Sequence, residues 1–410
     1  MRPALLAALL LTACGAAQDA PQQGAQEEAV GRAEAPLPAG APATLRVATF
    51  NASLYRDEAG QLARDLAAWT DPQLDAVAGV VAEVSPDILV LNEVDHDAGG
   101  AAVRLLGERL GYPYRLALPS NTGLASGFDL DGDGRSDHAP GSREYGGDAF
   151  GYGTHEGQYG IAVLSRLPLD EAGVRTWREA LWRDAPGPRP PEGFYPDGAL
   201  DVLRVSSKTH AVVPVRTGAG PLHLVLAHPT PPGFDGPEDR NGRRNGAEIA
   251  LLHAIVDPER GVPDDDDGRA GGLARDALFV IAGDLNADPA DGDGRGGPIS
   301  DLLASPLVID PAPRSAGGPA AAAAQAQANA EQSGDPALDT ADFSDGRVGN
   351  LRVDYVLPSA NMSVVDAGVF WPAEGEPAFD LVGSGWPVVS SDHRLVWVDL
   401  ALPIAGEGGG

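Results

Sequence analysis

The stretch that decides the fold reads Leu278-Phe279-Val280-Ile281-Ala282, followed by Gly283-Asp284-Leu285-Asn286. Its first part is continuously apolar rather than alternating, which is typical of a strand buried on both faces. Two polar residues, Asp284 and Asn286, follow the apolar run. Because open sheets bind ligands at their strand ends, this order predicts a functional site at the edge of a central sheet.

Other short apolar runs, bounded by Gly, Pro or Asp, extend this pattern along the chain. We expect strands at residues 45–50, 87–91, 161–165, 203–206, 222–227, 277–282, 353–357 and 395–400. Amphipathic stretches between some of them predict helices at residues 61–69, 73–84, 102–110 and 247–256. Strands mixed with helices predict an α/β or α+β sandwich that spans residues 44–402 as one domain.

The composition limits the class of protein. The 410 residues include 29 Lys and Arg against 59 Asp and Glu, which gives a formal net charge of −30. This balance argues against a broad surface for polyanions, because duplex DNA is bound largely by basic side chains. A small basic or metal-bridged phosphate site inside an acidic shell remains compatible with it. The single cysteine excludes a disulfide scaffold, and the 53 Gly and 36 Pro residues exclude a helical bundle.

The chain begins with an export signature, in which Arg2 precedes an apolar run at residues 4–11. The run ends in Leu11-Thr12-Ala13-Cys14-Gly15, which resembles a bacterial lipoprotein box with Cys14 as the lipidated residue. The alternative is a chance cysteine in an ordinary signal peptide.

We therefore expect a lipoprotein signal peptide at residues 1–13 and a lipid-anchored flexible linker at residues 14–43. Such a protein would be an exported cell-envelope lipoprotein, in the outer membrane or facing the periplasm, or would lie on the cell surface. Residues 315–334 predict a low-complexity insert that forms a loop or a weak helix, and residues 403–410 predict a flexible tail.

Polar residues flank several of the predicted strands: Asn51, Glu93, His228, Asp284, Asn286, Asp354, Asp392 and His393. A single residue of this kind, such as Asn51 or Asp392, could equally cap a turn. The whole set offers carboxylates, carboxamides and two histidines without a cysteine. These ligands suit a hard, oxygen-ligated cation such as Mg²⁺ or Mn²⁺ rather than a thiolate zinc site.

Six short motifs occur in an order that is typical of one superfamily: Thr49-Phe50-Asn51, Leu91-Asn92-Glu93, Gly160-Ile161-Ala162-Val163-Leu164-Ser165-Arg166, Gly283-Asp284-Leu285-Asn286, Val353-Asp354-Tyr355-Val356 and Ser391-Asp392-His393. The chain thereby resembles the endonuclease/exonuclease/phosphatase superfamily. This resemblance implies a deoxyribonuclease I-like four-layer sandwich, an α/β (α+β) fold in which helices flank two packed mixed β-sheets.

The resemblance also implies a metal site. Glu93 would be the principal ligand of Mg²⁺ or Mn²⁺, and Asn51 and Asp392 would complete or support it. The implied reaction is hydrolysis of a phosphodiester by attack of a metal-activated water.

Five further residues take catalytic roles by the same resemblance. Asp284 would orient or deprotonate the attacking water, and Asn286 would hydrogen-bond the developing phosphorane. Asp354 and His393 would form an Asp–His pair, and His228 would face the phosphate from the other side. A carboxylate beside a histidine raises its pKa and keeps a cation available against negative charge.

A separate acidic stretch, residues 129–137, has the D-x-D-x-D-G-x-x-D spacing of a calcium loop. It predicts a structural Ca²⁺ held by Asp129, Asp131, Asp133 and Asp137. The alternative is an acidic turn that binds no ion.

Two basic groups are candidates for contact with the substrate phosphate. Lys208 and His210 would share a face if they lay on a strand. Arg243 and Arg244 concentrate positive charge near a predicted helix start. The alternative in both cases is structural, with ion pairs to nearby carboxylates and a solvent-facing histidine.

The function that we expect is an exported metal-dependent phosphoesterase that cleaves phosphodiesters, as a nuclease or phosphodiesterase. Sphingomyelinase-like or phosphomonoesterase activity is the alternative within the same class. From another class, a catalytically silent calcium-dependent surface module would be expected if one of the residues Glu93, Asp284, His228 and His393 were missing, and all are present. The expected partners are a phosphoester substrate, including nucleic acid or nucleotides, and a membrane through the lipid anchor alone. The expected oligomeric state is a monomer.

Overall fold

The computed structural model describes residues 44–234, 236–385 and 387–402. The predicted signal peptide, Cys14, the linker up to residue 43 and the tail from residue 403 lie outside the described residues. Among the helices of the described part, none combines the length and the apolar character that a membrane crossing needs.

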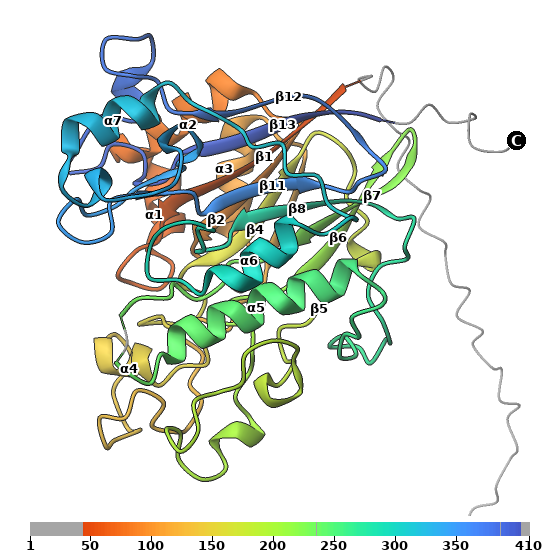
Figure 1. Cartoon of the computed structure of the whole chain (residues 1–410), viewed down its shortest axis with the longest axis vertical. Coiled ribbons are helices and arrows are strands. Elements are labelled where there is room, and N and C mark those ends of the chain that lie inside the picture. The colour runs from red at the N-terminus through yellow and green to blue at the C-terminus, as the bar shows by residue number, and fades with distance from the viewer. Residues whose placement is uncertain (1–43, 235, 386, 403–410) are drawn as a thin grey trace, which may run out of the picture. The chain divides into compact units, whose positions relative to one another are not determined.

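Six strands form the first mixed sheet, in the order β12-β13-β1-β2-β4-β3 (Figure 1). Strands β1 and β2 pair in parallel, and the other neighbours pair antiparallel. The strand bounds are β1 Thr44–Leu54, β2 Ile88–Val94, β3 Tyr114–Leu118, β4 Gly160–Ser165, β12 Ser363–Phe370 and β13 Leu395–Ala401.

Five strands form the second mixed sheet, in the order β11-β8-β7-β6-β5. Strands β7 and β8 are parallel, and the remaining pairs are antiparallel. The bounds are β5 Arg175–Thr176, β6 Ala211–Thr217, β7 Gly220–Leu226, β8 Leu278–Asp284 and β11 Asp354–Pro358. Two short strands, β9 (Ala341–Asp342) and β10 (Asn350–Leu351), pair separately.

Strand β8 is apolar from Leu278 to Ala282 because both of its faces are buried. Val280 belongs to the core that the two sheets share, whereas the next residue, Ile281, packs in a second core with helix α5 (Arg240–Val256). Successive side chains of a strand point to opposite faces, so a strand covered on both sides must be apolar at every position.

Helices cover the outer face of each sheet (Figure 1). On the first sheet lie α1 (Gln61–Ala68), α2 (Pro72–Val84) and α3 (Ala101–Leu110), whose buried residues join the shared core. Helix α5 packs on the second sheet together with α6 (Gly296–Leu303). This order of helices, sheet, sheet and helices confirms the predicted sandwich.

Further helices lie in the loops. These are α4 (Arg143–Gly147), α7 (Gly317–Gln325) and the 3₁₀ helices Glu171–Gly173, Trp182–Asp184, Ala199–Asp201, Gln327–Ala330, Pro336–Leu338 and Phe379–Leu381. Helix α7 lies within the low-complexity insert at residues 315–334.

The predicted strand at residues 203–206 was wrong. Only an isolated bridge from Arg204 to Leu181 forms there, so the segment follows an irregular loop despite its apolar residues. Strands β3, β6 and β12 and the two-residue strands β5, β9 and β10 were not predicted. Pro214 interrupts the strand pattern of β6, and β12 alternates weakly with an exposed first half.

The sheet topology gathers the polar residues at one edge. Strands β1 and β2 end there, and β13, which is antiparallel to β1, begins there. In the second sheet β7 and β8 end at this edge, and β11 begins at it, with Asp354 directly opposite Asp284 in the ladder. The parallel and antiparallel pairings therefore converge on one site.

Candidate active site

Asp284, the last residue of β8, is the centre of the site. Its side chain is 1% exposed, and its Oδ2 accepts a hydrogen bond from Asn51 Nδ2 at 3.0 Å. The ring nitrogens Nε2 of His228 and His393 lie 3.4 and 3.7 Å from the same oxygen. Asn92, on β2, accepts a hydrogen bond from the Asp284 amide at 3.2 Å and so ties the first sheet to the second.

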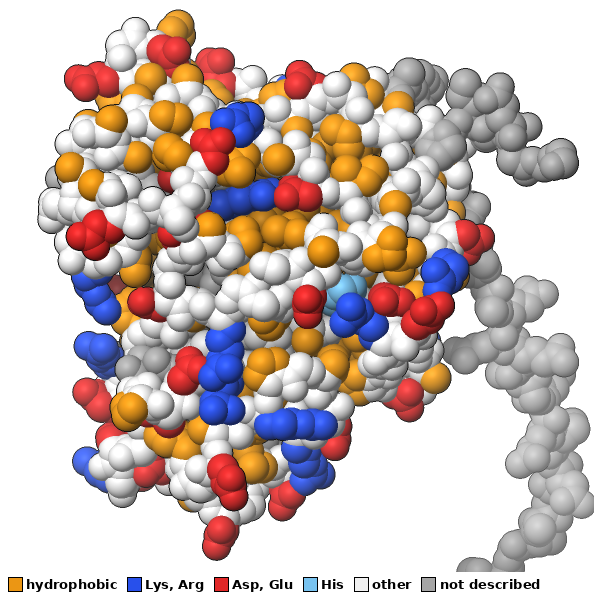
Figure 2. All heavy atoms as spheres, in the orientation of Figure 1, with side chains coloured by type: hydrophobic (Ala, Val, Ile, Leu, Met, Phe, Trp, Pro, Cys, Tyr) orange, Lys and Arg blue, Asp and Glu red, His pale blue; other side chains and the backbone are white. Residues whose placement is uncertain are grey.

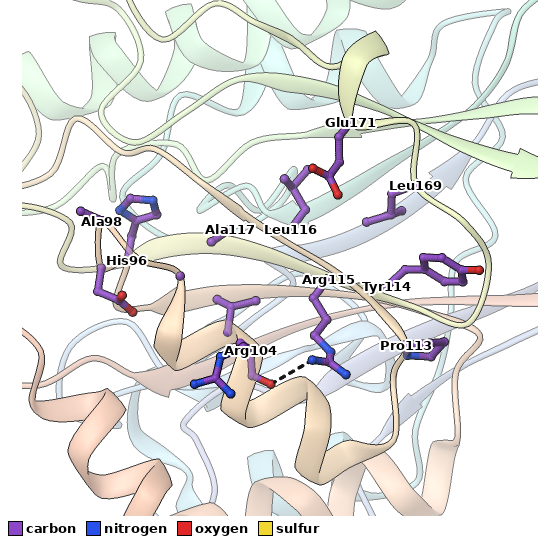
Figure 3. Close-up of a pocket in the computed structure, with 13 residues that line it drawn as sticks. His96, Ala98, Arg104, Pro113, Tyr114, Arg115, Leu116, Ala117, Leu169 and Glu171 are labelled. Atoms are coloured by element: carbon purple, nitrogen blue, oxygen red, sulfur yellow. Dashed lines mark hydrogen bonds between the residues drawn. The ribbon is translucent and has the colours of Figure 1, made fainter. Parts of the chain in front are cut away.

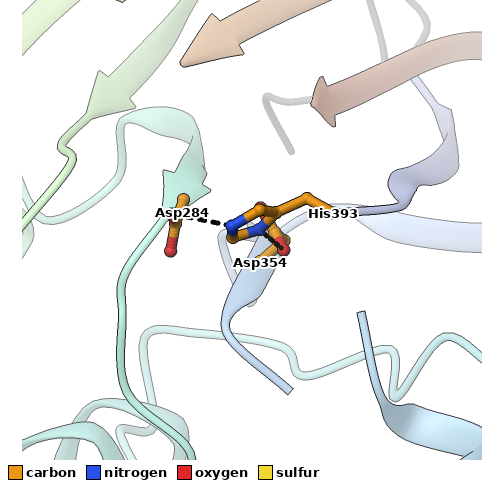
Figure 4. Close-up of side chains that lie close together, drawn as sticks. All are labelled: Asp284, Asp354 and His393. Atoms are coloured by element: carbon orange, nitrogen blue, oxygen red, sulfur yellow. Dashed lines mark hydrogen bonds and ion pairs between the residues drawn. The ribbon is translucent and has the colours of Figure 1, made fainter. Parts of the chain in front are cut away.

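His393 is held between two carboxylates (Figure 4). Its Nδ1 lies 2.9 Å from Asp354 Oδ2, and its Nε2 faces Asp284. Thr340 Oγ1 donates to the same Asp354 oxygen at 2.9 Å, which fixes that carboxylate. Burial by itself would lower the pKa of His393, but Asp354 and Asp284 raise that pKa well above its ordinary range. This direction favours the cationic form of the ring.

His228, two residues beyond β7, is in the opposite state. Burial lowers its pKa well below the ordinary range, and the positive charges of Lys208 and His393 lower it further. The two imidazoles beside Asp284 thus have pKa values that are shifted in opposite directions. Environments that separate the pKa values of two like groups are the usual mark of divided acid–base roles.

The loop that carries Asn286 is held by a residue outside the motif Gly283-Asp284-Leu285-Asn286. Asn286 has a φ of +50°, in the left-handed region that asparagine tolerates, and its amide donates to Asp284 Oδ1 at 2.9 Å. Asn245, on α5, donates to the carbonyls of Leu285 and Asn286 at 3.0 and 3.1 Å. Sequence reasoning missed Asn245, because nothing in its local pattern relates it to a loop 40 residues away.

The residues at the predicted metal site offer oxygen ligands. Burial raises the pKa of Glu93 to about 7, and the charges of Asp392 and Asp284 raise it while His393 and Asn51 oppose them. Ser53 Oγ donates to Asp392 Oδ1 at 3.2 Å. The carboxylates of Glu93, Asp284 and Asp392 lie near one another, and Lys208 also interacts with Glu93 and Asp284. A hard divalent cation bound to these oxygen ligands would offset the repulsion between the carboxylates.

A different trio of ligand atoms lies closest together at this edge. One atom each of Asp284, Asp354 and His393 lies within 4.8 Å of the others. Because the His393–Asp354 hydrogen bond already occupies two of these groups, we assign the trio to proton and charge chemistry. Glu93 then remains the principal candidate for the metal.

Two cavities, of about 390 and 670 Å³, meet at Glu93 and Tyr159. The smaller is lined by Asp284, Asn286, Asp392 and His393 and continues over Tyr55, Phe343 and Val348. The larger lies on the His228 side and holds four basic side chains: Arg143, Lys208, Arg240 and Arg244. The reactive groups therefore lie where two recesses join.

Of the four basic candidates for phosphate contact, the structure brings two to the larger cavity. Lys208 is buried there, and Arg244 lines the wall while its guanidinium donates to loop carbonyls such as Val205 at 3.0 Å. His210 lines neither cavity, because its ring is bound to Ser206 and to the Glu248 carbonyl at 2.7 and 2.9 Å.

Arg243 also lies away from both cavities, and its Nε donates to the carbonyl of Glu238 at 3.3 Å. The predicted face shared by Lys208 and His210 is absent, because residues 207–210 form a loop before β6 rather than a strand.

Only two of the four predicted calcium ligands in residues 129–137 lie close together. Asp129 and Asp131 come together with Asp148, which the sequence prediction did not include. Asp133 instead lies 2.9 Å from His138 Nε2, and Asp137 pairs with Arg135 at 2.9 Å on the surface.

Another cavity, of about 430 Å³, lies between α3 and β3 (Figure 3). Its lining includes His96, Arg104, Arg115 and Glu171 but none of the predicted site residues. On the face shown in Figure 2, basic and acidic side chains are interspersed rather than gathered into a basic field.

Comparison with known proteins gives the family. A search of curated proteins returned no match. Among solved structures, the chain is similar to an endonuclease/exonuclease/phosphatase from Beutenbergia cavernae DSM 12333, with 21% identity over 88% of this chain and 72% of that one and a TM-score of 0.49.

Two further similar structures are truncated TDP2 from Caenorhabditis elegans and sphingomyelinase C from Streptomyces griseocarneus. The first is 15% identical over 87% of this chain and 97% of its own, with a TM-score of 0.43. The second is 16% identical over 87% and 99%, with a TM-score of 0.43.

The model of the Endonuclease/Exonuclease/phosphatase family matches residues 48–393, a span that contains all of the catalytic and metal candidates described above. The chain therefore belongs to the Endonuclease/Exonuclease/phosphatase family.

Proposed function

We propose that the chain is an exported, metal-dependent phosphoesterase that hydrolyses phosphodiester bonds, as a nuclease or phosphodiesterase. Enzymes of its family are hydrolases that act on phosphoesters. One observation carries the proposal: the buried network of Asn51, Asp284, His228, His393 and Asp354 reaches two neighbouring cavities, the smaller through Asp284 and His393 and the larger through His228.

Asp284 is the residue that we assign to the attacking water. Its Oδ2 is held by the Asn51 amide, and its Oδ1 is held by the Asn286 backbone. A carboxylate fixed in this way orients a water and accepts its proton as the water attacks phosphorus. Asn51 is also a candidate ligand of the metal, so its contact with Asp284 links the position of the base to the metal site.

His393 and Asn286 are the donors that we assign to the developing negative charge. Asp354 holds the His393 ring in place and keeps it cationic. A fixed cation and an amide donor stabilise charge that grows on the phosphoryl oxygens, and they do so without reorganisation. His228, neutral and on the opposite side of Asp284, offers a second polar contact to the phosphate.

The metal ligands follow from the donor chemistry. Glu93 would hold the cation with support from Asn51 and Asp392, and all three offer oxygen. Mg²⁺ or Mn²⁺ bound there would polarise a phosphoryl oxygen as a Lewis acid.

The two cavities favour a diester over a monoester. Glu93 and Tyr159 line both, so a phosphate bound at their junction has a recess on either side for a substituent. The smaller recess is partly aromatic, and the larger carries four basic side chains together with the carboxylates of Glu93, Asp131, Asp133 and Glu144. A long duplex is disfavoured, because the net charge of −30 opposes extended phosphate contact.

The test is hydrolysis by the full chain of bis(p-nitrophenyl) phosphate, p-nitrophenyl phosphate, plasmid DNA and sphingomyelin, each with Mg²⁺, Mn²⁺ or EDTA. We expect metal-dependent turnover of the diester that Asp284→Asn abolishes and that Asp380→Asn, at an exposed aspartate outside both cavities, leaves intact. Equal turnover by Asp284→Asn would refute the assignment of the base. Faster cleavage of the monoester would refute the diester preference.

A further inference from the structure

A second acidic cluster lies outside the catalytic network. One carboxylate oxygen each of Asp129, Asp131 and Asp148 lies within 4.8 Å of the others. Asp129 and Asp131 come from the loop between β3 and α4, whereas Asp148 is the C-terminal cap residue of α4. The cluster therefore joins the acidic loop to the end of the short helix that follows it in the chain.

Asp148 supplies the observation that distinguishes this cluster from an ordinary acidic turn. The residue is 6% exposed, and its Oδ1 accepts from the Leu130 amide at 2.8 Å. Its Oδ2 is buried without a hydrogen-bond partner among the described residues, and it lies 3.9 Å from His138 Nε2. A buried, unpartnered carboxylate oxygen is unfavourable unless the carboxyl is protonated or a cation binds it.

The charges in the cluster repel one another. Burial raises the pKa of Asp148, and the neighbouring carboxylates of Asp131 and Asp129 raise it further. His138 does not resolve this repulsion, because it lies closer to Asp133 than to Asp148.

Gly147 allows the two segments to approach. A Cβ atom at this position would lie 2.2 Å from Asp131 Oδ2, so that a larger residue would push the Asp131 carboxylate away. The carboxylate thus lies directly against the backbone of α4, beside the residue that precedes Asp148.

We propose that Asp129, Asp131 and Asp148 bind one Ca²⁺ that joins the acidic loop to the end of α4. Three carboxylate oxygens without nitrogen or sulfur ligands suit a hard cation, and the irregular geometry of a loop suits Ca²⁺ better than Mg²⁺. Asp148 takes the place that local spacing gave to Asp137, whose carboxylate is fully exposed and paired with Arg135.

The site has a consequence for the larger cavity. Leu130 and Asp131 line that cavity from the loop, and Gly146 and Gly147 line it from α4. An ion that joins these segments fixes one wall of the cavity. This consequence rests on the proposed function: Ca²⁺ should lower the KM for a diester while leaving kcat little changed, since it does not touch the reacting atoms.

The binding test is independent of catalysis. The full chain carrying Glu93→Gln, to weaken the catalytic metal site, is stripped with EDTA and analysed by equilibrium dialysis with ⁴⁵Ca²⁺. We expect Asp148→Asn in this background to bind one equivalent fewer, and Asp137→Asn to bind the same amount as the background. Asp137→Asn is the matched control because it removes a carboxylate from the same acidic stretch.

Thermal melting separates a binding role from a structural one. Asn at position 148 keeps the acceptor for the Leu130 amide and removes the repulsion, so Asp148→Asn should melt in EDTA at or above the temperature of the parent. In Ca²⁺ the parent should gain stability and the variant should not. If Asp148→Asn does not fold, Asp131→Asn, at a less buried position, is judged by the same two measurements.

Unchanged stoichiometry together with an unchanged Ca²⁺-induced rise in melting temperature would overturn the proposal. Loss of the same equivalent in Asp137→Asn would also overturn it, in favour of the ligand set given by local spacing. Because these measurements need no substrate, a chain that binds Ca²⁺ but hydrolyses nothing would refute the proposed function alone.

Discussion

Asp339 gives a prediction whose sign and size follow from the structure. The residue is 6% exposed, and its Oδ2 has no hydrogen-bond partner within the described part of the chain. Burial raises its pKa from 3.8 to about 7, and the charges of Asp288, Asp291 and Asp335 add to the effect. Between these two pKa values, the native protein therefore keeps a proton on Asp339 that the unfolded chain has released.

The sign follows from linkage between protonation and folding. Stability from the neutral carboxyl is complete below the unfolded pKa and is lost as pH rises through about 7. A pKa difference of about 3 corresponds to ~4 kcal/mol. Part of this change falls below pH 5, and local relaxation around the ionised carboxylate reduces the rest, so we expect about 2 kcal/mol between pH 5 and pH 8.5.

The perturbation is Asp339→Asn, which cannot ionise. The parent should lose stability as the pH rises, and the variant should not. The free energy of unfolding of the variant minus that of the parent should therefore increase by about 2 kcal/mol from pH 5 to pH 8.5. The measurement is urea unfolding of both proteins in EDTA across this range, with Asp380→Asn as an exposed control. A difference that stays constant with pH would refute the reasoning, because it would mean that Asp339 is ionised in both states.

Three further predictions concern the active site. Asp354→Asn should lower kcat by about 10²-fold or more with little change in KM, because His393 loses its charged partner; steady-state kinetics with unchanged kcat would contradict this role. Lys208→Met should raise KM for a diester more than it lowers kcat, since the side chain lines the larger cavity, and the reverse split would place Lys208 in the chemical step. Asn245→Ala leaves the carbonyls of Thr230, Leu285 and Asn286 without this donor and should cost about 1–3 kcal/mol in urea unfolding; an unchanged unfolding curve would show that the loop does not depend on Asn245.

Much of the architecture was predictable because it depends on local patterns. The continuous apolar run before Asp284 predicted a strand buried on both faces, and β8 has this form. The polar residues at strand ends were predicted as one group, and the topology brings Asn51, Asp284, Asp354 and His393 within hydrogen-bonding or ion-pair distance. Both inferences needed only the apolar runs and the polar residues beside them in the sequence.

The remainder depends on contacts between distant segments. Asn245 supports the Asp284 loop from a helix, and Asp148 joins an acidic cluster whose local spacing pointed to Asp137. His210 is turned away from the cavity by hydrogen bonds to Ser206 and the α5 backbone. Spacing along the chain cannot predict such partners, because it does not encode which loop meets which helix end.

Asp284 and Asp354 face each other as partners in the β8–β11 ladder. A slip of one residue in this ladder would turn every side chain of the strand to the opposite face. The apolar strand β8 would still be covered on both sides, so a slipped molecule would keep much of its core. It would, however, separate the aspartate that we assign to water from the one that orients His393. Specific activity would then report on the fidelity of strand alignment during folding.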